Sequence, residues 1–384
     1  MAFGSQFEPA LVFAADAPDL ARDPTGMIQR IAAIDALFRD VPRLYLQISF
    51  KRVFRHGVES HGNMRVETLN YFLHHHIIAE RLRRARWVYV HSCMHAIKLF
   101  PHLKAVGPKL IVDLHGVVPE EIDFLGDHYL AKALGSIERQ AVRYGCGLVV
   151  VTRKLGNHIV SKYPQYADPD RILTVPNSNF RGPQRPAWGQ RDRSQPLRLI
   201  YAGTVNRWQK VDLMLEILVR LASQRPEVHT SIFVPPVFLP ELKRKVTQLG
   251  LDGRVQVDTR TPQDIVAEYS KADAGFVLRD DILINRVSMP TKMVEYIDYG
   301  LVPIVLSPAI GDFPEYGYRY LTVDDLFDPA QTGRERLDEM RSRNVRCLGR
   351  IYEDSARNAE RLRLMIAGDA AAVGPKAILP SSMR

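Results

Sequence analysis

Short apolar runs alternate with helical patterns over most of the chain. Two clear examples are residues 10–15 (Ala-Leu-Val-Phe-Ala-Ala) and 87–91 (Trp-Val-Tyr-Val-His). Continuous apolar strands that alternate with helices are typical of a parallel sheet covered on both faces. In the first half of the chain this pattern predicts strands at 10–15, 44–49, 64–69, 87–91, 109–113, 147–151 and 172–176.

The alternation stops at residues 181–196, which are rich in Pro, Gly and Arg and have no periodicity. Such a composition is typical of a linker. A second alternating series follows. It predicts strands at 197–202, 229–234, 254–258, 274–279 and 302–306, helices near 209–223, 237–249, 262–271 and 290–299, and one or two charged helices within 333–366.

The fold class is therefore α/β, with two doubly wound, Rossmann-like domains. We expect an N-terminal domain at 1–182, a linker at 183–196 and a C-terminal domain at 197–345. Residues 346–384 should form a helix that returns to the N-terminal domain, followed by a flexible tail. Because ligands bind at the carboxyl ends of strands in such sheets, we expect the two domains to face a central cleft.

Composition narrows the class of protein only slightly. The 384 residues are 46% hydrophobic and 25% charged, as in ordinary soluble proteins. No apolar run is long enough to span a bilayer, and the start, Met-Ala-Phe-Gly-Ser-Gln-Phe-Glu, lacks a signal-peptide pattern. Three widely spaced cysteines suggest reduced thiols in the cytoplasm. The net charge of +9 fits nucleic acid, an anionic membrane or a phosphate-bearing ligand, and does not choose among them.

The stretch 279–305 carries the clearest chemistry. It predicts a polar loop, a helix that begins at Pro290 and a turn at Gly300 before an apolar strand. Thr291 and Lys292 lie in the first helical turn, where free N–H groups attract an anion. Glu295 lies three residues after Lys292 on the same helix face, where a carboxylate can accept ribose hydroxyls. The pattern fits a nucleoside diphosphate site and equally an ordinary solvated helix start.

Other candidates also follow predicted strands. Gly203, Arg207 and Lys210 follow the strand at 197–202 and bring two cations to a strand end, where they could hold a diphosphate without a metal. His115 follows the strand at 109–113 and could donate a hydrogen bond to a ligand, although a lone histidine is more often structural. Gly26 opens a helix and would let the backbone approach a ligand closely.

Residues 70–86 combine aromatic and aliphatic residues with a basic end. Such a helix could lie on an anionic membrane, although packing against the first sheet is the simpler interpretation. The adjacent histidines 74–76 lack the spacing of a helical zinc site, so we expect no metal there.

Taken in order, four motifs resemble those of retaining glycosyltransferases of the GT-B fold, family-four type. They are Asp-Leu-His-Gly at 113–116, Val-Pro-Asn-Ser at 175–178, Gly203 with Lys210, and Pro-Thr-Lys-Met-Val-Glu-Tyr at 290–296 followed by Gly-Leu-Val-Pro at 300–303. The resemblance covers roughly residues 8–345 and is strongest in the second domain.

The resemblance implies roles for single residues. Glu295 would bind the ribose, and Lys210 and Lys292 would bind the diphosphate, with Arg207 as a weaker candidate. His115 would contact a hydroxyl of the transferred sugar. Gly203 and Thr291 would complete the nucleotide site, and in the first domain Gly26, supported by Arg30, would represent the family's glycine loop.

The sequence also departs from the family's motifs. The first carboxylate of the family's Glu, seven residues, Glu motif is replaced by Val287. Thr204 stands at the usual position of the loop arginine, and Val211 replaces the glycine after the loop lysine. The nucleotide half of the site is therefore better supported than the sugar half.

The resemblance implies a metal-independent transferase with no tightly bound cofactor. It would move a sugar from a GDP- or UDP-sugar donor to a glycan or polyprenyl-linked acceptor, in bacterial surface polysaccharide synthesis. The protein would be cytoplasmic, with an anionic membrane at the inner face as a further candidate partner.

Three alternatives remain open. A catalytically silent sugar-nucleotide-binding subunit is suggested by Val287, and a sugar-nucleotide epimerase would share the architecture. A nucleic-acid-binding protein is suggested by charge alone, but it would need a basic stripe with interleaved aromatics, which this sequence lacks. We therefore expect no nucleic acid partner.

Overall fold

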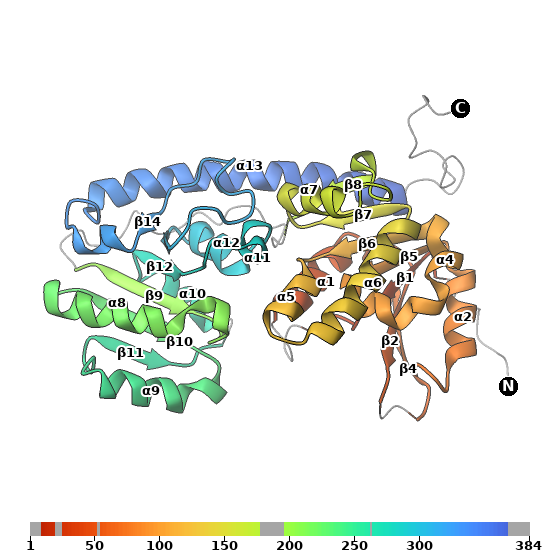
Figure 1. Ribbon diagram of the computed structural model, residues 1–384, viewed down its shortest axis with the longest axis horizontal. Helices are drawn as coiled ribbons and strands as arrows, with labels where there is room; N and C mark the ends of the chain where they lie inside the picture. Colours follow the sequence, from red (N-terminus) through yellow and green to blue (C-terminus); the bar gives the residue numbers. More distant parts are fainter. Residues whose placement is uncertain (1–8, 20–24, 52–53, 177–195, 262, 368–384) are drawn as a thin grey trace. The chain divides into compact units, whose positions relative to one another are not determined.

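The structure is a computed structural model that describes residues 9–19, 25–51, 54–176, 196–261 and 263–367. The chain divides into two compact units, Met1–Phe180 with Asp354–Arg384 (unit 1) and Arg181–Glu353 (unit 2). Each unit is built around one sheet flanked by helices (Figure 1). Of the features expected above, nearly all of the 183–196 linker, residues 177 and 178, and the tail from 368 lie outside the described residues.

Unit 1 holds an eight-stranded sheet in the order β3-β4-β2-β1-β5-β6-β7-β8. All neighbours are parallel except β3 and β4, which are antiparallel. Every strand predicted in this half is confirmed to within about two residues. The strands are β1 (Leu11–Ala14), β2 (Arg43–Ser49), β3 (Gly57–His61), β4 (Met64–Asn70), β5 (Trp87–His91), β6 (Leu110–Leu114), β7 (Gly147–Val150) and β8 (Ile172–Thr174).

The sequence did not predict β3. Its residues, Gly-Val-Glu-Ser-His, show no apolar alternation, and all five are exposed because the strand lies at the edge of the sheet. The helices of unit 1 are α1 (Gly26–Ala36), α2 (His75–Arg84), α3 (Ser92–Ala96), α4 (Leu103–Val106), α5 (Val118–Phe124), α6 (His128–Tyr144) and α7 (Arg153–Lys162).

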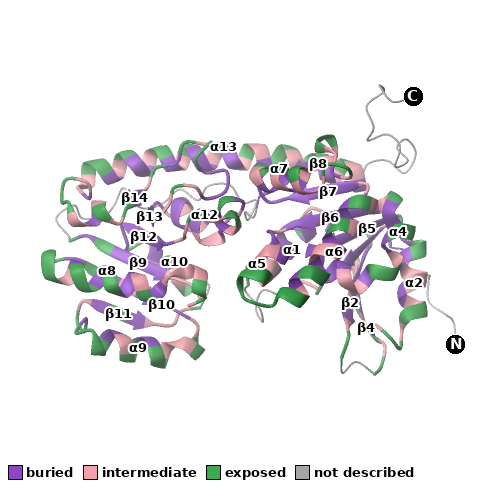
Figure 2. Ribbon diagram, in the orientation of Figure 1, coloured by how far each residue is buried: buried purple, intermediate pink, exposed green. Residues whose placement is uncertain are grey.

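The core of unit 1 lies along the central strands. Strands β1, β5, β6 and β7 are buried at every position, so both faces of the sheet are covered (Figure 2). Phe13 on β1 stacks on Tyr45 at 4.8 Å between ring centroids and meets Tyr89 edge-on at 5.5 Å. Burial on both faces explains why these strands read as continuous apolar runs.

Unit 2 holds a six-stranded, wholly parallel sheet in the order β11-β10-β9-β12-β13-β14. The five predicted strands are confirmed, and the two-residue β14 is additional. The strands are β9 (Arg198–Ala202), β10 (His229–Phe233), β11 (Val255–Asp258), β12 (Ala274–Val277), β13 (Val302–Val305) and β14 (Leu321–Thr322); the helices are α8 (Val211–Gln224), α9 (Leu239–Gln248), α10 (Asp264–Tyr269), α11 (Leu283–Arg286) and α12 (Thr291–Asp298).

The helix predicted to begin at Pro290 begins one residue later. Pro290 is its N-cap, with φ −67° and ψ 123°, and its carbonyl accepts a hydrogen bond from the Met293 N–H at 3.0 Å. The turn predicted at Gly300 is confirmed, since that residue has φ +72°.

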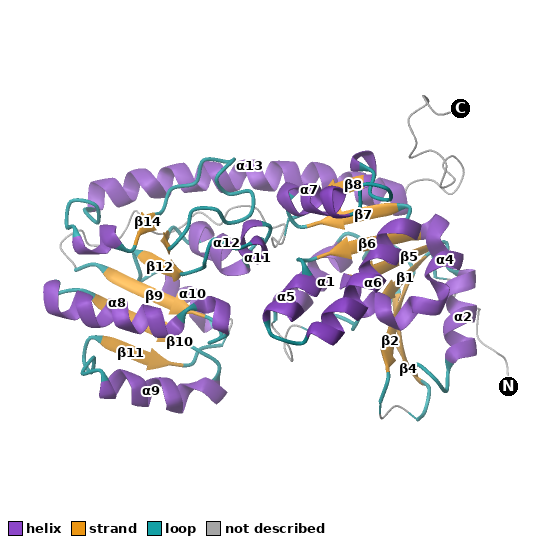
Figure 3. Ribbon diagram, viewed as in Figure 1, coloured by secondary structure: helices purple, strands orange, loops and turns teal. Residues whose placement is uncertain are grey.

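The charged stretch near the C-terminus forms a single helix, α13 (Arg334–Ala367), of 34 residues (Figure 3). Its part from Asp354 onward belongs to unit 1. There the Asn358 amide donates to the Thr174 carbonyl at 2.8 Å, and Arg363 pairs with Asp40 at 2.8 Å. Among the helices of the described residues, none has the length and apolar character to cross a bilayer.

Candidate functional site

Lys292 is the central cation of the candidate site in unit 2. It lies in the first turn of α12, and its Nζ is 3.7 Å from the centroid of the Tyr201 ring at the end of β9. The ammonium donates a hydrogen bond to Gln209 Oε1 at 3.3 Å. Among the described residues no carboxylate forms an ion pair with Lys292. Burial lowers the pKa of Lys292 well below its ordinary value, and Arg279 lowers it further, while Glu295 opposes the shift.

Two glycines let α12 approach the ends of β9 and β12. A Cβ on Gly203 would lie 2.7 Å from Lys292 Nζ, so a larger residue there would displace the ammonium. A Cβ on Gly275 would lie 2.4 Å from the Tyr296 ring, whose hydroxyl accepts a hydrogen bond from the Ala202 N–H at 3.0 Å. Tyr296 therefore fixes the first turns of α12 against the strand end that precedes Gly203.

Glu295 lies beside Lys292 on α12, as the spacing predicted. Its Oε2 accepts a hydrogen bond from the Tyr269 hydroxyl at 3.0 Å. Burial raises the pKa of Glu295, although Tyr269 and Lys292 act in the opposite direction. Thr291 is the first residue of the helix and is half-buried. The structure thus brings a cation and a carboxylate together at the mouth of α12.

The loop after β9 presents the other predicted cations. Arg207 is exposed on a short 3-10 turn, and Lys210 follows in the left-handed region, with φ 52°. Lys210 Nζ pairs with Asp280 at 2.7 Å. Both cations line a pocket of about 490 Å³ whose apolar wall includes Val205, Val211, Phe238 and Leu242. That volume suits a small-molecule ligand, but the lining includes neither Lys292 nor Glu295.

The structure shows the surroundings of two of the three residues at which this sequence departs from the family's motifs. Val287 is buried, with its N–H donating to the Leu283 carbonyl at 3.1 Å, so it serves packing after α11. The carbonyl of Thr204 accepts a hydrogen bond from the Tyr201 hydroxyl. Asp280, which the sequence analysis did not select, supplies a carboxylate to the same loop cluster.

His115 marks the candidate site of unit 1. It follows β6, and its side chain is only 11% exposed. Its Nε2 lies 3.4 Å from Asp113 Oδ2 and 3.3 Å from His91 Nδ1. Burial lowers the pKa of His91 to about 4, so that ring is neutral near pH 7.

Asp113 is the buried anion that organises this cluster. It accepts two hydrogen bonds from Arg30, at 3.1 and 3.0 Å, and one from the Tyr89 hydroxyl at 2.9 Å. Burial alone would raise the pKa of Asp113, but Arg30 and His115 hold it well below its ordinary value. His115 is therefore held by a buried, charge-balanced network.

Arg30 differs from its predicted role. Its side chain has no exposed surface, and its guanidinium also donates to the carbonyls of Val175 and Pro176 at 2.6 and 3.1 Å. With its donors used internally, Arg30 supports Asp113 and not a ligand-binding loop. Gly26 is exposed at the start of α1, as the sequence predicted, but the residues directly before it, 20–24, lie outside the described ranges.

His91, Asp113 and His115 are also the described residues that could hold a metal, since their ligand atoms lie within 4.8 Å of one another. However, Asp113 Oδ2 already accepts hydrogen bonds from Arg30 and Tyr89, whose positive charge and O–H fill the space around that oxygen. The residues fit a hydrogen-bonded network better than a cation site. In the triple histidine, His74 Nδ1 accepts a hydrogen bond from the Asn70 N–H at 2.9 Å.

Comparisons with known proteins find matches among solved structures only. No protein-family model matches the chain, and no curated protein sequence matches it. Among solved structures, Anabaena HepE in complex with UDP and glucose aligns with a TM-score of 0.63 at 14% identity, over 92% of this chain and 99% of that one.

Two further solved structures give the same result. The trehalose-6-phosphate protein from E. coli bound with UDP-2-fluoro glucose aligns with a TM-score of 0.62 at 12% identity, over 94% and 99% of the two chains. The alpha,alpha-trehalose 6-phosphate synthase from Burkholderia multivorans aligns with a TM-score of 0.60 at 13% identity, over 97% and 95%. These likenesses show that the chain has the GT-B fold, as the sequence motifs predicted.

Proposed function

We propose that this protein is a glycosyltransferase that takes a sugar from a nucleoside-diphosphate sugar. The observation that carries the proposal is Lys292, a half-buried ammonium at a helix N-terminus. It forms no ion pair with a carboxylate of the described residues, and Glu295 attracts it only through space. A diphosphate placed there would gain the helix N–H groups and the ammonium together. The fold supports the proposal, because the aligned structures of this fold include two with UDP or a UDP-sugar bound.

We assign each candidate residue a contact with the donor sugar nucleotide. Lys292 and Lys210 bind the diphosphate, with Arg207 at the rim, and Gly203 and Thr291 leave room for it. Glu295, oriented by Tyr269, accepts the ribose hydroxyls. His115, held by Asp113, contacts a hydroxyl of the transferred sugar. Gly26 stays a candidate for close backbone approach to a ligand.

We propose a retaining reaction without a metal. The bond from the anomeric carbon to the diphosphate breaks as the acceptor oxygen attaches to the same face. The acceptor's proton passes to a phosphate oxygen of the leaving group. Cations at the diphosphate stabilise the charge that develops on it, and no side-chain nucleophile is needed.

The proposed acceptor is a glycan or a polyprenyl-linked glycan, and the proposed setting is polysaccharide synthesis at the cytoplasmic face of a bacterial membrane. A net charge of +9 supports an anionic surface nearby. A second candidate function is a silent sugar-nucleotide-binding subunit. It is favoured by Val287, since an apolar, buried residue replaces a family carboxylate.

Thermal-shift and calorimetric binding of UDP, GDP, ADP and CMP tests the donor site. Stabilisation by one diphosphate that Lys292→Met and Glu295→Gln abolish supports it and identifies the base. Lys243→Met and Glu216→Gln change exposed residues on α9 and α8 and serve as matched controls. No stabilisation by any nucleotide at millimolar concentration would contradict the proposal. Binding without release of sugar from any UDP- or GDP-sugar would favour the silent subunit.

A further inference from the structure

Five large apolar side chains project from one end of the sheet in unit 1. Phe54 is 77% exposed and Phe72 67%, and Phe50, Val58 and Leu73 are each more than two-fifths exposed. We call these five residues the apolar tip. Isolated exposed apolar residues need no explanation, but a contiguous group marks an interaction surface.

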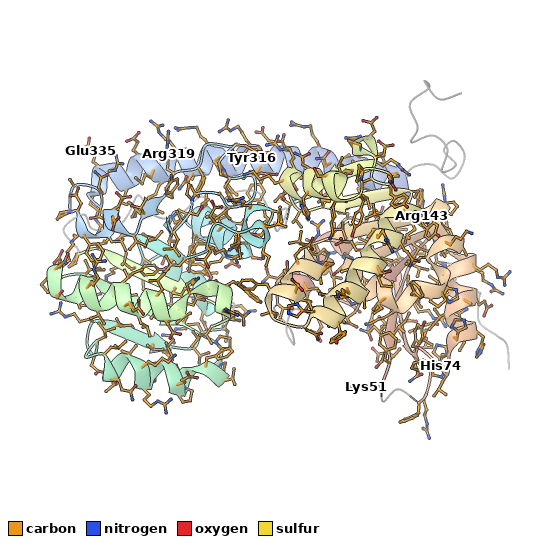
Figure 4. The ribbon with its side chains drawn as sticks, viewed as in Figure 1. Lys51, His74, Arg143, Tyr316, Arg319 and Glu335 are labelled. Carbon is orange, nitrogen blue, oxygen red and sulfur yellow. The ribbon has the colours of Figure 1, made fainter. Side chains whose placement is uncertain are left out.

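Aromatic contacts link the segments that carry the apolar tip, and His56 lies 6.0 Å from His74 between ring centroids. Phe50 lies 4.9 Å from Tyr71 and 6.3 Å from Phe72 between ring centroids, and Tyr71 meets Phe72 edge-on at 5.0 Å. Phe50 directly follows β2 and Tyr71 directly follows β4, which are parallel neighbours. Figure 4 labels Lys51 and His74 at this end of the sheet.

The turns that carry these side chains are held by their own polar groups. Asn70 Oδ1 accepts hydrogen bonds from the N–H groups of Phe72 and Leu73, at 2.9 and 3.0 Å. Ser49 Oγ accepts one from the Lys51 N–H at 3.1 Å and donates to the Lys51 carbonyl. The backbone of Lys51, Phe72 and Leu73 is thus hydrogen-bonded within its own turns, which lowers the cost of moving these residues out of water.

Charge indicates the kind of partner. The segments 50–58 and 71–79 contain no Asp or Glu, and Lys51 and Arg55 are exposed beside the apolar tip. Glu59, directly after Val58, is exposed as well and lies 3.7 Å from His61. Aromatic side chains flanked by cations match the interface of an anionic bilayer, where rings lie among the acyl chains and cations meet the headgroups. We infer that the apolar tip docks this protein on an anionic lipid bilayer.

The placement differs from the sequence-based hypothesis of a membrane-bound helix at 70–86. On α2 itself, Ile78 and Leu82 are buried, so its apolar face packs within unit 1. The surface that remains free is formed by the turns beside the helix.

The location also bears on the proposed acceptor, a step that rests on the proposed function. Strands β4, β2, β1, β5 and β6 are all parallel, so the apolar tip and His115 emerge at the same edge of one sheet. Four strand spacings separate β4 from β6, which is about 19 Å along the sheet. A lipid-linked acceptor in the docked bilayer would be within reach of that edge.

Co-sedimentation of the full chain with vesicles tests the inference. We expect binding to vesicles that contain phosphatidylglycerol and much weaker binding to pure phosphatidylcholine. Phe54→Ser with Phe72→Ser should weaken binding by about a hundredfold, since each ring contributes on the order of one decade when buried. Lys51→Glu with Arg55→Glu should weaken it by roughly tenfold, and about 1 M NaCl should weaken wild-type binding similarly.

Matched controls change the same residue classes elsewhere. Leu364→Ser removes an exposed leucine of α13, and Lys104→Glu with Arg361→Glu reverses two exposed cations. These variants should bind like the wild type. Equal losses in tip and control variants, or no wild-type sedimentation, would overturn the inference.

A different interface is also detectable. If the chain dimerises without lipid and Phe54→Ser with Phe72→Ser makes it monomeric, the apolar tip is a self-association surface and the bilayer assignment is wrong. Nucleotide binding is measured without lipid, so failure of the donor site and failure of bilayer docking are separate results.

Discussion

The ammonium of Lys292 lies over the face of the Tyr201 ring, 3.7 Å from its centroid. The ring's negative face partly offsets the loss of water around the charge, yet it is a weaker partner than a carboxylate. This explains why the pKa of Lys292 lies well below its ordinary value despite the nearby ring. In the unliganded protein the Tyr201 ring and Glu295 favour the charged form of Lys292, and an added anion would favour it further.

Binding of a nucleoside diphosphate should be accompanied by proton uptake. The diphosphate favours the charged form of Lys292 and so raises its lowered pKa. Affinity should then fall as the pH rises from the pKa of the free protein toward that of the complex. Calorimetry at several pH values below 10.5, in buffers of different ionisation heat, measures the uptake, and Lys292→Met should abolish it. Identical heats in all buffers would show that Lys292 does not change its protonation.

Removing the Lys292 charge should stabilise the unliganded protein. In the wild type the unfolded state binds the lysine proton more tightly than the folded state, so stability rises with pH between the lowered folded pKa and the ordinary value of 10.5. Lys292→Met lacks this dependence and should gain about 0.5–2 kcal/mol, with the largest gain at low pH. Melting temperatures without nucleotide measure it, with Lys243→Met as the control. A less stable Lys292→Met variant would mean that Tyr201 and Gln209 already compensate the charge.

Local patterns in the sequence predict most of this fold. The continuous apolar runs locate the buried parallel strands, and Pro290 and Gly300 define α12 to within a residue. They fail for β3, which is exposed at a sheet edge, since its pairing with β4 and not its own composition makes it a strand.

The candidate site is less predictable, because its key partners are distant in the chain. Arg30 and Asp113 are 83 residues apart, so no local pattern could show that Arg30 serves a buried carboxylate. Asp280 likewise reaches Lys210 only through the fold. Tyr201 lies within the predicted strand 197–202, and its ring contact with Lys292 depends on Gly203. The one sequence signal for that contact was the glycine directly after an apolar strand.

Gly203→Ala should separate nucleotide binding from folding. The added Cβ would meet Lys292 Nζ at 2.7 Å and Cε at 3.0 Å, so the lysine must move. The lysine side chain can yield, but Gly203 also has φ +154°, a conformation that L side chains rarely adopt. We therefore expect a loss of stability of about 1–3 kcal/mol and at least about tenfold weaker diphosphate binding. Gly349→Ala, on α13 with open space around it, is the control and should not weaken binding. Unchanged affinity in Gly203→Ala would place the phosphate away from Lys292.

Asp280→Asn should separate nucleotide binding from turnover. The variant breaks the ion pair between Asp280 and Lys210, and so frees the lysine for the diphosphate. In that pair the lysine side chain is 35% exposed and the aspartate side chain 42%. An ion pair of this exposure contributes at most about 1 kcal/mol, so free diphosphate should bind up to about fivefold more tightly. Glu339→Gln, which breaks an exposed pair with Arg343 on α13, serves as the control.

Turnover shows whether Asp280 has a second role. If Asp280 substitutes for the carboxylate missing at Val287, sugar release from the donor should fall even as diphosphate binding tightens. Tighter binding with unchanged turnover would limit Asp280 to restraining Lys210.

His91 should give the unfolding free energy a specific acid dependence. Burial lowers its pKa from 6.5 to about 4, so between those values the unfolded chain takes up a proton that the folded protein excludes. The contribution of neutral His91 to the free energy of unfolding is therefore fully present above pH 6.5 and is lost as the pH falls toward 4. Over that range the free energy of unfolding changes by about 3 kcal/mol. His91→Phe keeps an aromatic ring beside Phe13 and should remove that part of the acid dependence. Denaturant unfolding at several pH values measures it, with His61→Phe, on the exposed β3, as the control. If the free energy of unfolding of both variants depends on pH as in the wild type, another buried group causes the acid sensitivity of unit 1.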